Sequence, residues 1–342
     1  MTMNRATKHR THFSGPRQDI RPIFTSLNGD NSWLLSFPRP VAERKSTGKA
    51  YFHVVLEPWL NGPQVEYASW LAHLSLSSQP AVSDGAGVEN LVQEVEQAAA
   101  DAGIVSPRAV TPEANSPIDA VFMNFHYGDH LHVPTLLTFN PTITVFATVE
   151  AAAIIKKLNH FDNTVTYKDL DSKTFNGDWT NLHPGRLLPS YLTLFRIRGH
   201  HELNFLSALI WSPSPNNHEA VLYSPHGLHT STPALQTLLH HSAPEFKTLA
   251  LLHGLKESWT FNWQTTFGVA TGLELQRETN AEYWINTHND RLGYWGLVWF
   301  FANDIFKTIE WGLGQEKKGE NGEVRKEVKV IDVENGGCLV LE

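Results

Sequence analysis

The sequence predicts an α/β fold, and two observations support this prediction. Short apolar runs typical of buried strands alternate with longer segments whose apolar residues recur at helical spacing, as over residues 119–158. The 342 residues are 41% hydrophobic and include 11 Trp, which is enough to bury a large core as one big domain or as two similar halves.

Composition argues against several classes of protein. The formal net charge is −8 and the pI is near 6.1, so the surface offers no general attraction for nucleic acid or an acidic membrane. The single cysteine, Cys338, excludes an internal disulfide framework and a Cys-rich zinc module. The first twenty residues lack the apolar stretch of a secretory signal, and no apolar run is long enough for a membrane-spanning helix. We therefore expect a cytoplasmic protein whose partner is a small-molecule substrate; its oligomeric state is left open.

The first half of the chain carries four predicted strands and three predicted helices. The strands are short and largely apolar, at residues 32–37, 50–56, 119–123 and 142–148. The helices are at residues 88–102, 135–138 and 149–158. Gly103 is expected to end the first helix, because glycine adopts the left-handed conformation that commonly terminates helices.

The second half repeats this alternation without repeating the sequence. Its predicted strands are at residues 164–167, 192–198, 206–211, 220–223, 248–252 and 283–287. A helix is predicted over residues 268–279, directly before the last of these strands.

The domain prediction separates one folded region from its two ends. Residues 1–19 are basic and polar and are expected to form a disordered tail, and residues 20–314 are expected to form the domain. Residues 315–326 are charged and glycine-rich, which predicts a flexible connector. Residues 327–342 contain two short apolar runs around Asn335-Gly336, which predicts a terminal β-hairpin.

Potential metal ligands cluster in the loop that follows strand 119–123. This loop holds His126, Asp129, His130 and His132 within seven residues. Neutral imidazole and ionised carboxylate are the usual ligands of zinc and non-haem iron. The alternative interpretation is a polar surface loop in which histidines happen to cluster.

Imidazole recurs at later strand ends, which favours the metal interpretation. His residues follow the predicted strands at 200–201, 226, 253 and 288, and repetition at successive strand ends is typical of an assembled site. Glu57 also ends a strand, and it could be a site carboxylate or a residue that orients a neighbour.

The order of these strand-end motifs resembles the metallo-β-lactamase superfamily. Within it, the chain looks most like the ascorbate-phosphate-lactonase-like branch found among fungal proteins. The matching features lie within residues 28–37, 54–63, 119–132, 145–161, 223–227, 249–254 and 277–290. The resemblance implies an αββα four-layer sandwich in which two sheets pack face to face with helices outside.

The resemblance also assigns site residues, with one departure. When the superfamily motif His-x-His-x-Asp-His is aligned on Asp129 and His130, its two leading His positions fall on the aromatic residues Phe125 and Tyr127. Asp129, His130 and His288 would then form one metal site with an open position. This degenerate motif implies a mononuclear site.

Three further positions are expected near that site. His226 lies where the superfamily usually has a carboxylate that bridges two metals, and it is expected to replace that ligand. His132 is expected to ligate or to support Asp129. Only one of the adjacent His200 and His201 should face the site, and His201 is taken as the ligand.

The function implied by the resemblance is that of a metal-dependent hydrolase. A metal-bound hydroxide would attack the carbonyl of a small cyclic ester or amide of lactone type, with Asp129 acting as ligand and proton acceptor. The expected cofactor is one divalent metal ion, zinc in the first instance, with iron or manganese as alternatives. The alternative function is that of a non-hydrolytic member, which has lost the first metal site and binds or isomerises a metabolite.

Overall fold

A computed structural model describes residues 4–15, 20–66, 68, 70–106, 116–316 and 327–342 of the chain. The described chain divides into two compact units. The first comprises residues 1–64, 74–167 and 333–342, and the second comprises residues 65–73 and 168–332. None of the described helices combines the length and the apolar character needed to cross a membrane.

The first unit is built on a seven-stranded sheet with the order β19-β1-β2-β3-β6-β7-β8. Its strands are β1 (Ile23–Ser26), β2 (Trp33–Pro38), β3 (Tyr51–Leu56), β6 (Ala120–Met123), β7 (Thr144–Ala147), β8 (Thr164–Thr166) and β19 (Cys338–Val340). Strands β3, β6, β7 and β8 run parallel. Because the carboxyl ends of parallel strands meet at one edge of a sheet, the loops after β3 and β6 lie together there.

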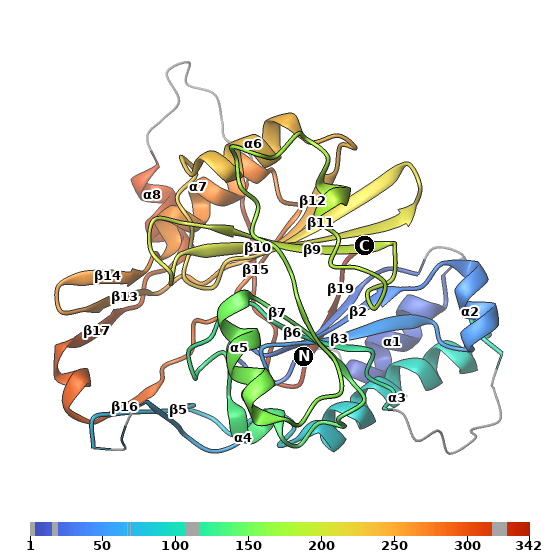
Figure 1. Ribbon diagram of the computed structural model, residues 1–342, viewed down its shortest axis with the longest axis horizontal. Helices are drawn as coiled ribbons and strands as arrows, with labels where there is room; N and C mark the ends of the chain where they lie inside the picture. Colours follow the sequence, from blue (N-terminus) through green and yellow to red (C-terminus); the bar gives the residue numbers. More distant parts are fainter. Residues whose placement is uncertain (1–3, 16–19, 67, 69, 107–115, 317–326) are drawn as a thin grey trace. The chain divides into compact units, whose positions relative to one another are not determined.

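Helices cover this sheet through a continuous apolar core. The helices are α1 (Arg5–Phe13), α2 (Val41–Thr47), α3 (Gly85–Asp101), α4 (Val133–Leu136) and α5 (Val149–Leu158). Val88 and Val92 of α3 and Ile155 of α5 are buried with Val121 and Val145 of the sheet. Helix α5 packs beside β7 and β8, and Figure 1 shows it next to β7. The predicted helices at 88–102 and 149–158 are therefore confirmed, each to within a few residues.

The second unit is built on a six-stranded sheet with the order β18-β15-β12-β11-β10-β9. Its strands are β9 (Leu192–Arg198), β10 (Phe205–Ser214), β11 (Asn217–Tyr223), β12 (Lys247–Leu252), β15 (Tyr283–Ile285) and β18 (Val330–Ile331). Strands β11, β12, β15 and β18 run parallel, so the loops after β11, β12 and β15 share one edge. Helices α6 (Pro233–His241) and α7 (Val269–Thr279) bury Leu235 and Leu275 in the core of this sheet.

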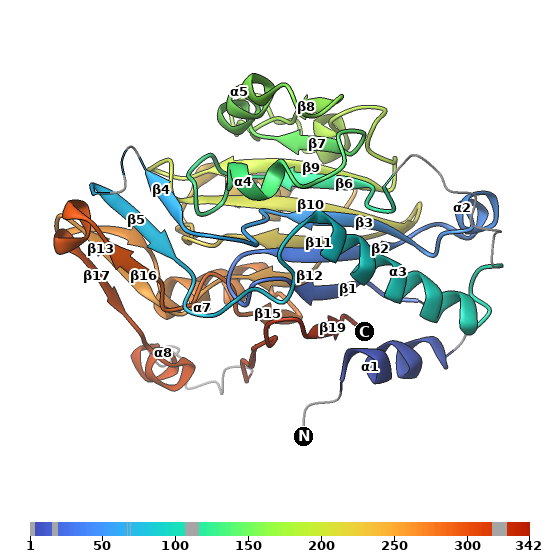
Figure 2. The same cartoon turned by 90° about the horizontal axis from the view of Figure 1, so that it is seen from below.

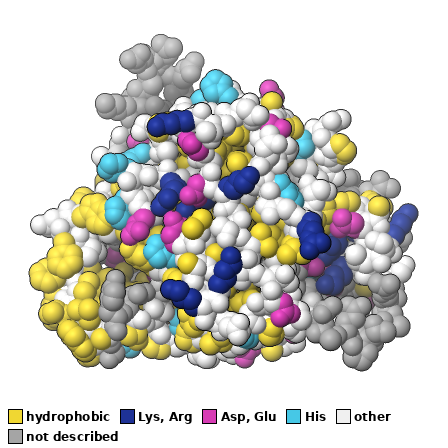
Figure 3. Space-filling view, in the orientation of Figure 1, with side chains coloured by type: hydrophobic (Ala, Val, Ile, Leu, Met, Phe, Trp, Pro, Cys, Tyr) yellow, Lys and Arg dark blue, Asp and Glu magenta, His cyan; other side chains and the backbone are white. Residues whose placement is uncertain are grey.

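Smaller elements complete the chain. They are β4 (Gln64–Glu66), β5 (Ala72–Ser75), β13 (Glu257–Thr260), β14 (Trp263–Thr266), β16 (Gly293–Trp295), β17 (Ala302–Ile305), α8 (Ile309–Gln315) and the 3-10 helices η1 (Trp179–Leu182) and η2 (Leu297–Phe301). They include two three-stranded sheets, with orders β14-β13-β17 and β16-β5-β4. Exposed large apolar side chains gather over β13, β14, β16 and η2, at the left of Figure 3.

The prediction of a disordered amino-terminal tail is wrong for residues 5–13, which form α1. The Asn4 side chain accepts a hydrogen bond from the backbone N–H of Thr7 and so caps the helix. The Arg5 guanidinium contacts both carboxylate oxygens of Glu94 on α3, at 2.9 and 2.7 Å, and Phe13 is buried. Figure 2 shows α1 alongside α3. These tertiary contacts order a segment whose own composition is polar.

The predicted carboxy-terminal hairpin is also wrong. Strand β18 pairs in parallel with β15, with Val330 opposite Trp284, and β19 pairs antiparallel with β1, with Val340 opposite Ile23. Each strand thus extends a larger sheet, which buries more apolar surface than an isolated two-stranded hairpin would. Most of the predicted connector, residues 317–326, lies outside the described residues.

The predicted α/β class is confirmed, because the structure contains both helices and two large sheets.

Candidate metal centre

A buried carboxylate and a buried imidazole meet where β3 and β6 end. Glu57 directly follows β3, and His130 lies in the loop after β6; both side chains are fully buried. The Glu57 carboxylate lies 2.5 Å from His130 Nδ1 and accepts a second hydrogen bond from the backbone N–H of Asn124 at 3.1 Å. Glu57 has a positive φ of 44°, a conformation that non-glycine residues adopt rarely and that recurs at functional sites.

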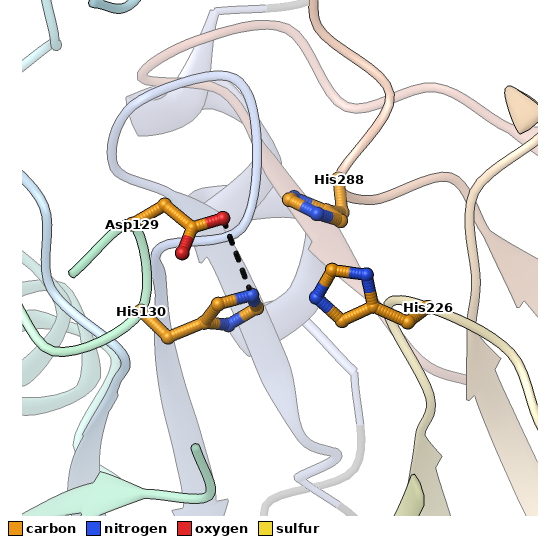
Figure 4. A group of neighbouring side chains, drawn as sticks. All are labelled: Asp129, His130, His226 and His288. Carbon is orange, nitrogen blue, oxygen red and sulfur yellow. Dashed lines mark ion pairs between the residues drawn. The ribbon is translucent and has the colours of Figure 1, made fainter. Parts of the chain in front are cut away.

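This contact fixes the orientation of the His130 ring. An ionised carboxylate can only accept hydrogen bonds, so Nδ1 of His130 carries the donated proton. Nε2 is then the nitrogen that can act as a metal ligand, and it lies 3.6 Å from the Asp129 carboxylate, as the dashed line in Figure 4 marks. A carboxylate behind a histidine is the usual means of orienting a metal-ligating imidazole.

The same surroundings change the pKa of His130. Burial alone would lower the pKa, but the charges of Glu57 and Asp129 and the hydrogen bond to Glu57 outweigh it and raise the pKa to about 9. In the metal-free protein, His130 therefore holds its proton more tightly when folded than when unfolded.

A pH dependence of stability follows for the metal-free protein. The folded pKa of about 9 lies above the ordinary value of 6.5, so the stability contributed by protonated His130 is fully present below pH 6.5 and is lost as the pH rises through about 9. Urea unfolding of chelator-treated protein across this range should show the loss. The variant Glu57→Gln should reduce this slope, since it removes the charge that holds the proton; equal slopes in the two proteins would contradict this origin.

Two further histidines meet where β11 and β15 end. His226 follows β11, and its Nδ1 lies 2.9 Å from the Thr266 hydroxyl oxygen on β14. His288 follows β15, is 3% exposed and has a positive φ of 52°. The two imidazole rings lie 4.7 Å apart at an interplanar angle of 72°.

The residue directly after His226 is a glycine, and the backbone at this position is one that favours glycine. Gly227 has a φ of 84°, and a Cβ atom there would lie 2.8 Å from Phe267 Cβ and 3.0 Å from His253 Nε2. A side chain at this position would therefore both strain the backbone and collide with its neighbours.

Four of the predicted residues could together hold a metal ion. The ligand atoms of Asp129, His130, His226 and His288 lie within 4.8 Å of one another, and the three histidines are buried (Figure 4). Three imidazoles and one carboxylate match the ligand chemistry of zinc and of non-haem iron. The polar partners Glu57 and Thr266, each on a ring nitrogen, are the kind that metal-ligating histidines have.

The structure does not bring the other two predicted ligands into this group. His132 is buried at the start of α4, where its Nδ1 contacts the hydroxyl of Thr135 at 2.8 Å, and so it caps a helix. His201 packs its ring at 4.0 Å from the indole of Trp263.

The remaining strand-end histidines also lie outside the group. His200 is exposed, and His253 is fully buried with its Nδ1 2.6 Å from the carbonyl of Gly254. Burial lowers the pKa of His253 to about 4, so its ring is neutral.

The aromatic residues at the two leading motif positions differ in burial. Phe125 is 1% exposed, and its ring lies edge-on to that of His130 at 5.3 Å. Tyr127 is 38% exposed and contacts the Phe125 ring at 4.7 Å. Neither side chain is one of the usual zinc ligands.

One positioning residue was missed from the sequence. Thr266 lies on a short strand with exposed aromatic neighbours, and no local pattern distinguishes it from any surface threonine. Its contact with His226 spans 40 positions in the sequence and becomes visible only in the folded chain.

Comparison with known proteins finds similarity at the level of structure. No protein-family model matches the sequence, and no curated protein gives a significant sequence match. The structure is similar to that of an isothiocyanate hydrolase from Delia radicum gut bacteria, with a TM-score of 0.54 and 12% identity over 93% of this chain and 99% of that one. It is also similar to a possible metal-dependent hydrolase from Veillonella parvula, with a TM-score of 0.50 and 11% identity over 94% and 99% of the two chains.

A third structure shows a weaker similarity. The metallo-β-lactamase fold protein YhfI from Bacillus subtilis matches with a TM-score of 0.39 and 10% identity, over 80% of this chain and 88% of that one. At these identities the similarity concerns the fold alone, and it does not test the branch predicted from the sequence.

Proposed function

We propose that this protein is a metal-dependent hydrolase that binds one divalent ion, zinc in the first instance, through Asp129, His130, His226 and His288. The observation that carries the proposal is the convergence of these four ligand atoms within 4.8 Å. Iron and manganese are alternatives, because imidazole and carboxylate ligands suit them as well.

The chemistry of the site follows from its ligands. When bound, such an ion lowers the pKa of a coordinated water toward about 7 and polarises a substrate carbonyl. Glu57 positions His130 through the contact with Nδ1, and Thr266 positions His226 in the same way. These two contacts keep the rings in place before the ion arrives, which reduces the cost of binding it.

Asp129 is the proposed proton acceptor. Its side chain is 17% exposed, whereas that of His130 is fully buried, so Asp129 is the group of this pair that water and substrate can reach. A carboxylate close to the attacked carbon can accept the proton of the attacking water and pass it to the leaving group.

The proposed substrate is a small cyclic ester or amide of lactone type. Its carbonyl carbon is an electrophile that water attacks. Ring opening gives a single product, which carries both the new acid group and the new alcohol or amine group. The similar isothiocyanate hydrolase is, by its name, a hydrolase of isothiocyanates. The fold similarity therefore agrees with this class of reaction, although fold alone does not determine substrate.

The second candidate is a non-hydrolytic protein that binds or isomerises a metabolite. The buried Phe125 favours it, because this residue stands where the superfamily motif has a metal ligand and packs against the ring of His130.

Metal analysis and a substrate panel test the proposal together. The protein purified without chelator should contain about one zinc, iron or manganese per chain, and it should open at least one of a panel of lactones and cyclic amides. Chelator should abolish the activity and added metal should restore it. A metal-free protein that retains a bound metabolite would support the second candidate and contradict the first.

A further inference from the structure

The small strands of the second unit carry a patch of large apolar side chains that face solvent. This aromatic patch comprises Phe261, Trp263, Trp295, Leu297, Phe300 and Phe301, whose exposed fractions range from 44% to 83%. Figure 3 shows yellow side chains gathered at the left, where β13, β14 and β16 lie in Figure 1. Monomeric soluble proteins rarely expose a contiguous apolar patch larger than a few hundred Å², so a patch of this size indicates a binding surface.

The aromatic patch is held in place by regular structure. Phe261 donates its backbone N–H to the carbonyl of Phe301 at 3.0 Å, and their rings stack at 4.7 Å. Thr260 of β13 pairs with Ala302 of β17, and Leu297 of η2 donates its backbone N–H to the carbonyl of Trp70, itself 63% exposed. A surface fixed in this way loses little conformational entropy when a partner covers it.

The patch carries no formal charge, and neighbouring charges are engaged with one another. Asp304 accepts a hydrogen bond from the hydroxyl of Tyr294 at 2.6 Å and lies 4.0 Å from Lys256 Nζ. Lys307 contacts the Glu257 carboxylate at 2.5 Å. With a net charge of −8 on the chain, this arrangement does not suit anionic lipid, which requires clusters of basic residues.

The area and composition of the aromatic patch match one side of a stable protein interface. A large aromatic side chain has about 150–250 Å² of surface, so the exposed fractions of these six side chains amount to roughly 500–900 Å² of apolar area. A standard interface buries about 800 Å² on each partner, and its buried centre is rich in Trp, Phe and Tyr and poor in charge.

We propose that the aromatic patch is the interface between two copies of this chain, related by a twofold axis. In such a dimer the same surface packs against itself, and this is possible without repulsion because the patch is uncharged. The proposal is independent of the metal site and of the reaction proposed for it.

Sedimentation of the full chain over a range of micromolar concentrations tests the dimer. The wild-type protein should sediment at twice the 38.4 kDa of one chain. The double variant Trp295→Ser with Phe300→Ser should weaken dimerisation by at least about 30-fold, which corresponds to about 2 kcal/mol, the lower limit for interface residues that dominate binding. Both side chains are mostly exposed, so the fold and its melting temperature should be retained.

The matched control is Val149→Ser on α5, an apolar residue with 63% exposure that lies outside the patch. It should leave the dimer unchanged. A wild-type monomer, or a double variant that dimerises as well as the wild type, would overturn the proposal. Flotation of a monomeric wild-type protein with phosphatidylcholine vesicles, lost in the double variant, would overturn it in favour of a lipid surface.

Discussion

Replacing His130 by alanine should abolish the proposed metal binding and, with it, the proposed hydrolytic activity. His130 offers one of the four converging ligand atoms and is the one held by a buried carboxylate. Loss of a residue that only orients a ligand typically weakens metal binding by about 10–100-fold, and loss of the ligand itself should weaken it further. The measurement is zinc affinity by competition with a chromophoric chelator, together with the zinc content of the purified variant.

A second variant separates loss of a ligand from loss of the fold. His130→Ala leaves Glu57 buried without its imidazole partner, and breaking a buried ion pair in this way costs about 3–5 kcal/mol of stability. His288→Ala should cause a similar loss of zinc while it leaves the pair of Glu57 and His130 in place, so the melting temperatures of the two variants distinguish the two effects. The control His240→Ala removes an imidazole that is 57% exposed on α6 and should change neither readout. Unchanged zinc content in both His130→Ala and His288→Ala would reject the proposed ligand set.

The strands that present these residues could be predicted from the sequence because their apolar runs are short and end at polar residues. The strands β3, β6, β11 and β15 are followed within seven positions by Glu57, His130, His226 and His288, respectively. The order of the strands in a sheet decides which strand ends share an edge. That order is determined by packing between residues that are far apart in the sequence. The contact between Glu57 and His130 spans 73 positions. No local pattern could therefore show whether Glu57 is itself a site carboxylate or orients a neighbouring residue.

The elements that were not predicted lack such a local signal. Helix α1 is basic and polar, and its order depends on Glu94, which lies 89 positions from Arg5. Most side chains of β13, β14 and β17 are half-buried or exposed, and the sequences of these strands do not show the alternation of apolar and polar residues that marks a strand with one buried face. A surface that another molecule covers carries apolar side chains where an ordinary surface carries polar ones. The local sequence pattern therefore does not predict the strands beneath such a surface.

Replacing Phe125 by alanine should lower the free energy of unfolding by about 3–5 kcal/mol, the usual cost of removing a buried phenylalanine ring. Phe125 is 1% exposed and packs against the rings of His126, Tyr127 and His130 at 4.7–5.3 Å. Tyr127→Ala is the matched control: it removes a neighbouring ring that is 38% exposed, and it should cost about 1 kcal/mol. Denaturant unfolding measures both values, and equal losses would show that the burial of Phe125 is not what stabilises this loop.

The same two positions decide whether the loop can hold a second metal ion. The double variant Phe125→His with Tyr127→His restores the two leading imidazoles of the superfamily motif, each of which could add a nitrogen ligand at about 2.0–2.1 Å. We expect the zinc content under excess zinc to remain at about one per chain while stability falls, because Phe125 belongs to the packed core beside His130, whereas Tyr127 is partly exposed. A rise toward two zinc ions per chain would contradict this expectation, since it would mean that the aromatic pair occupies the space of a second metal site.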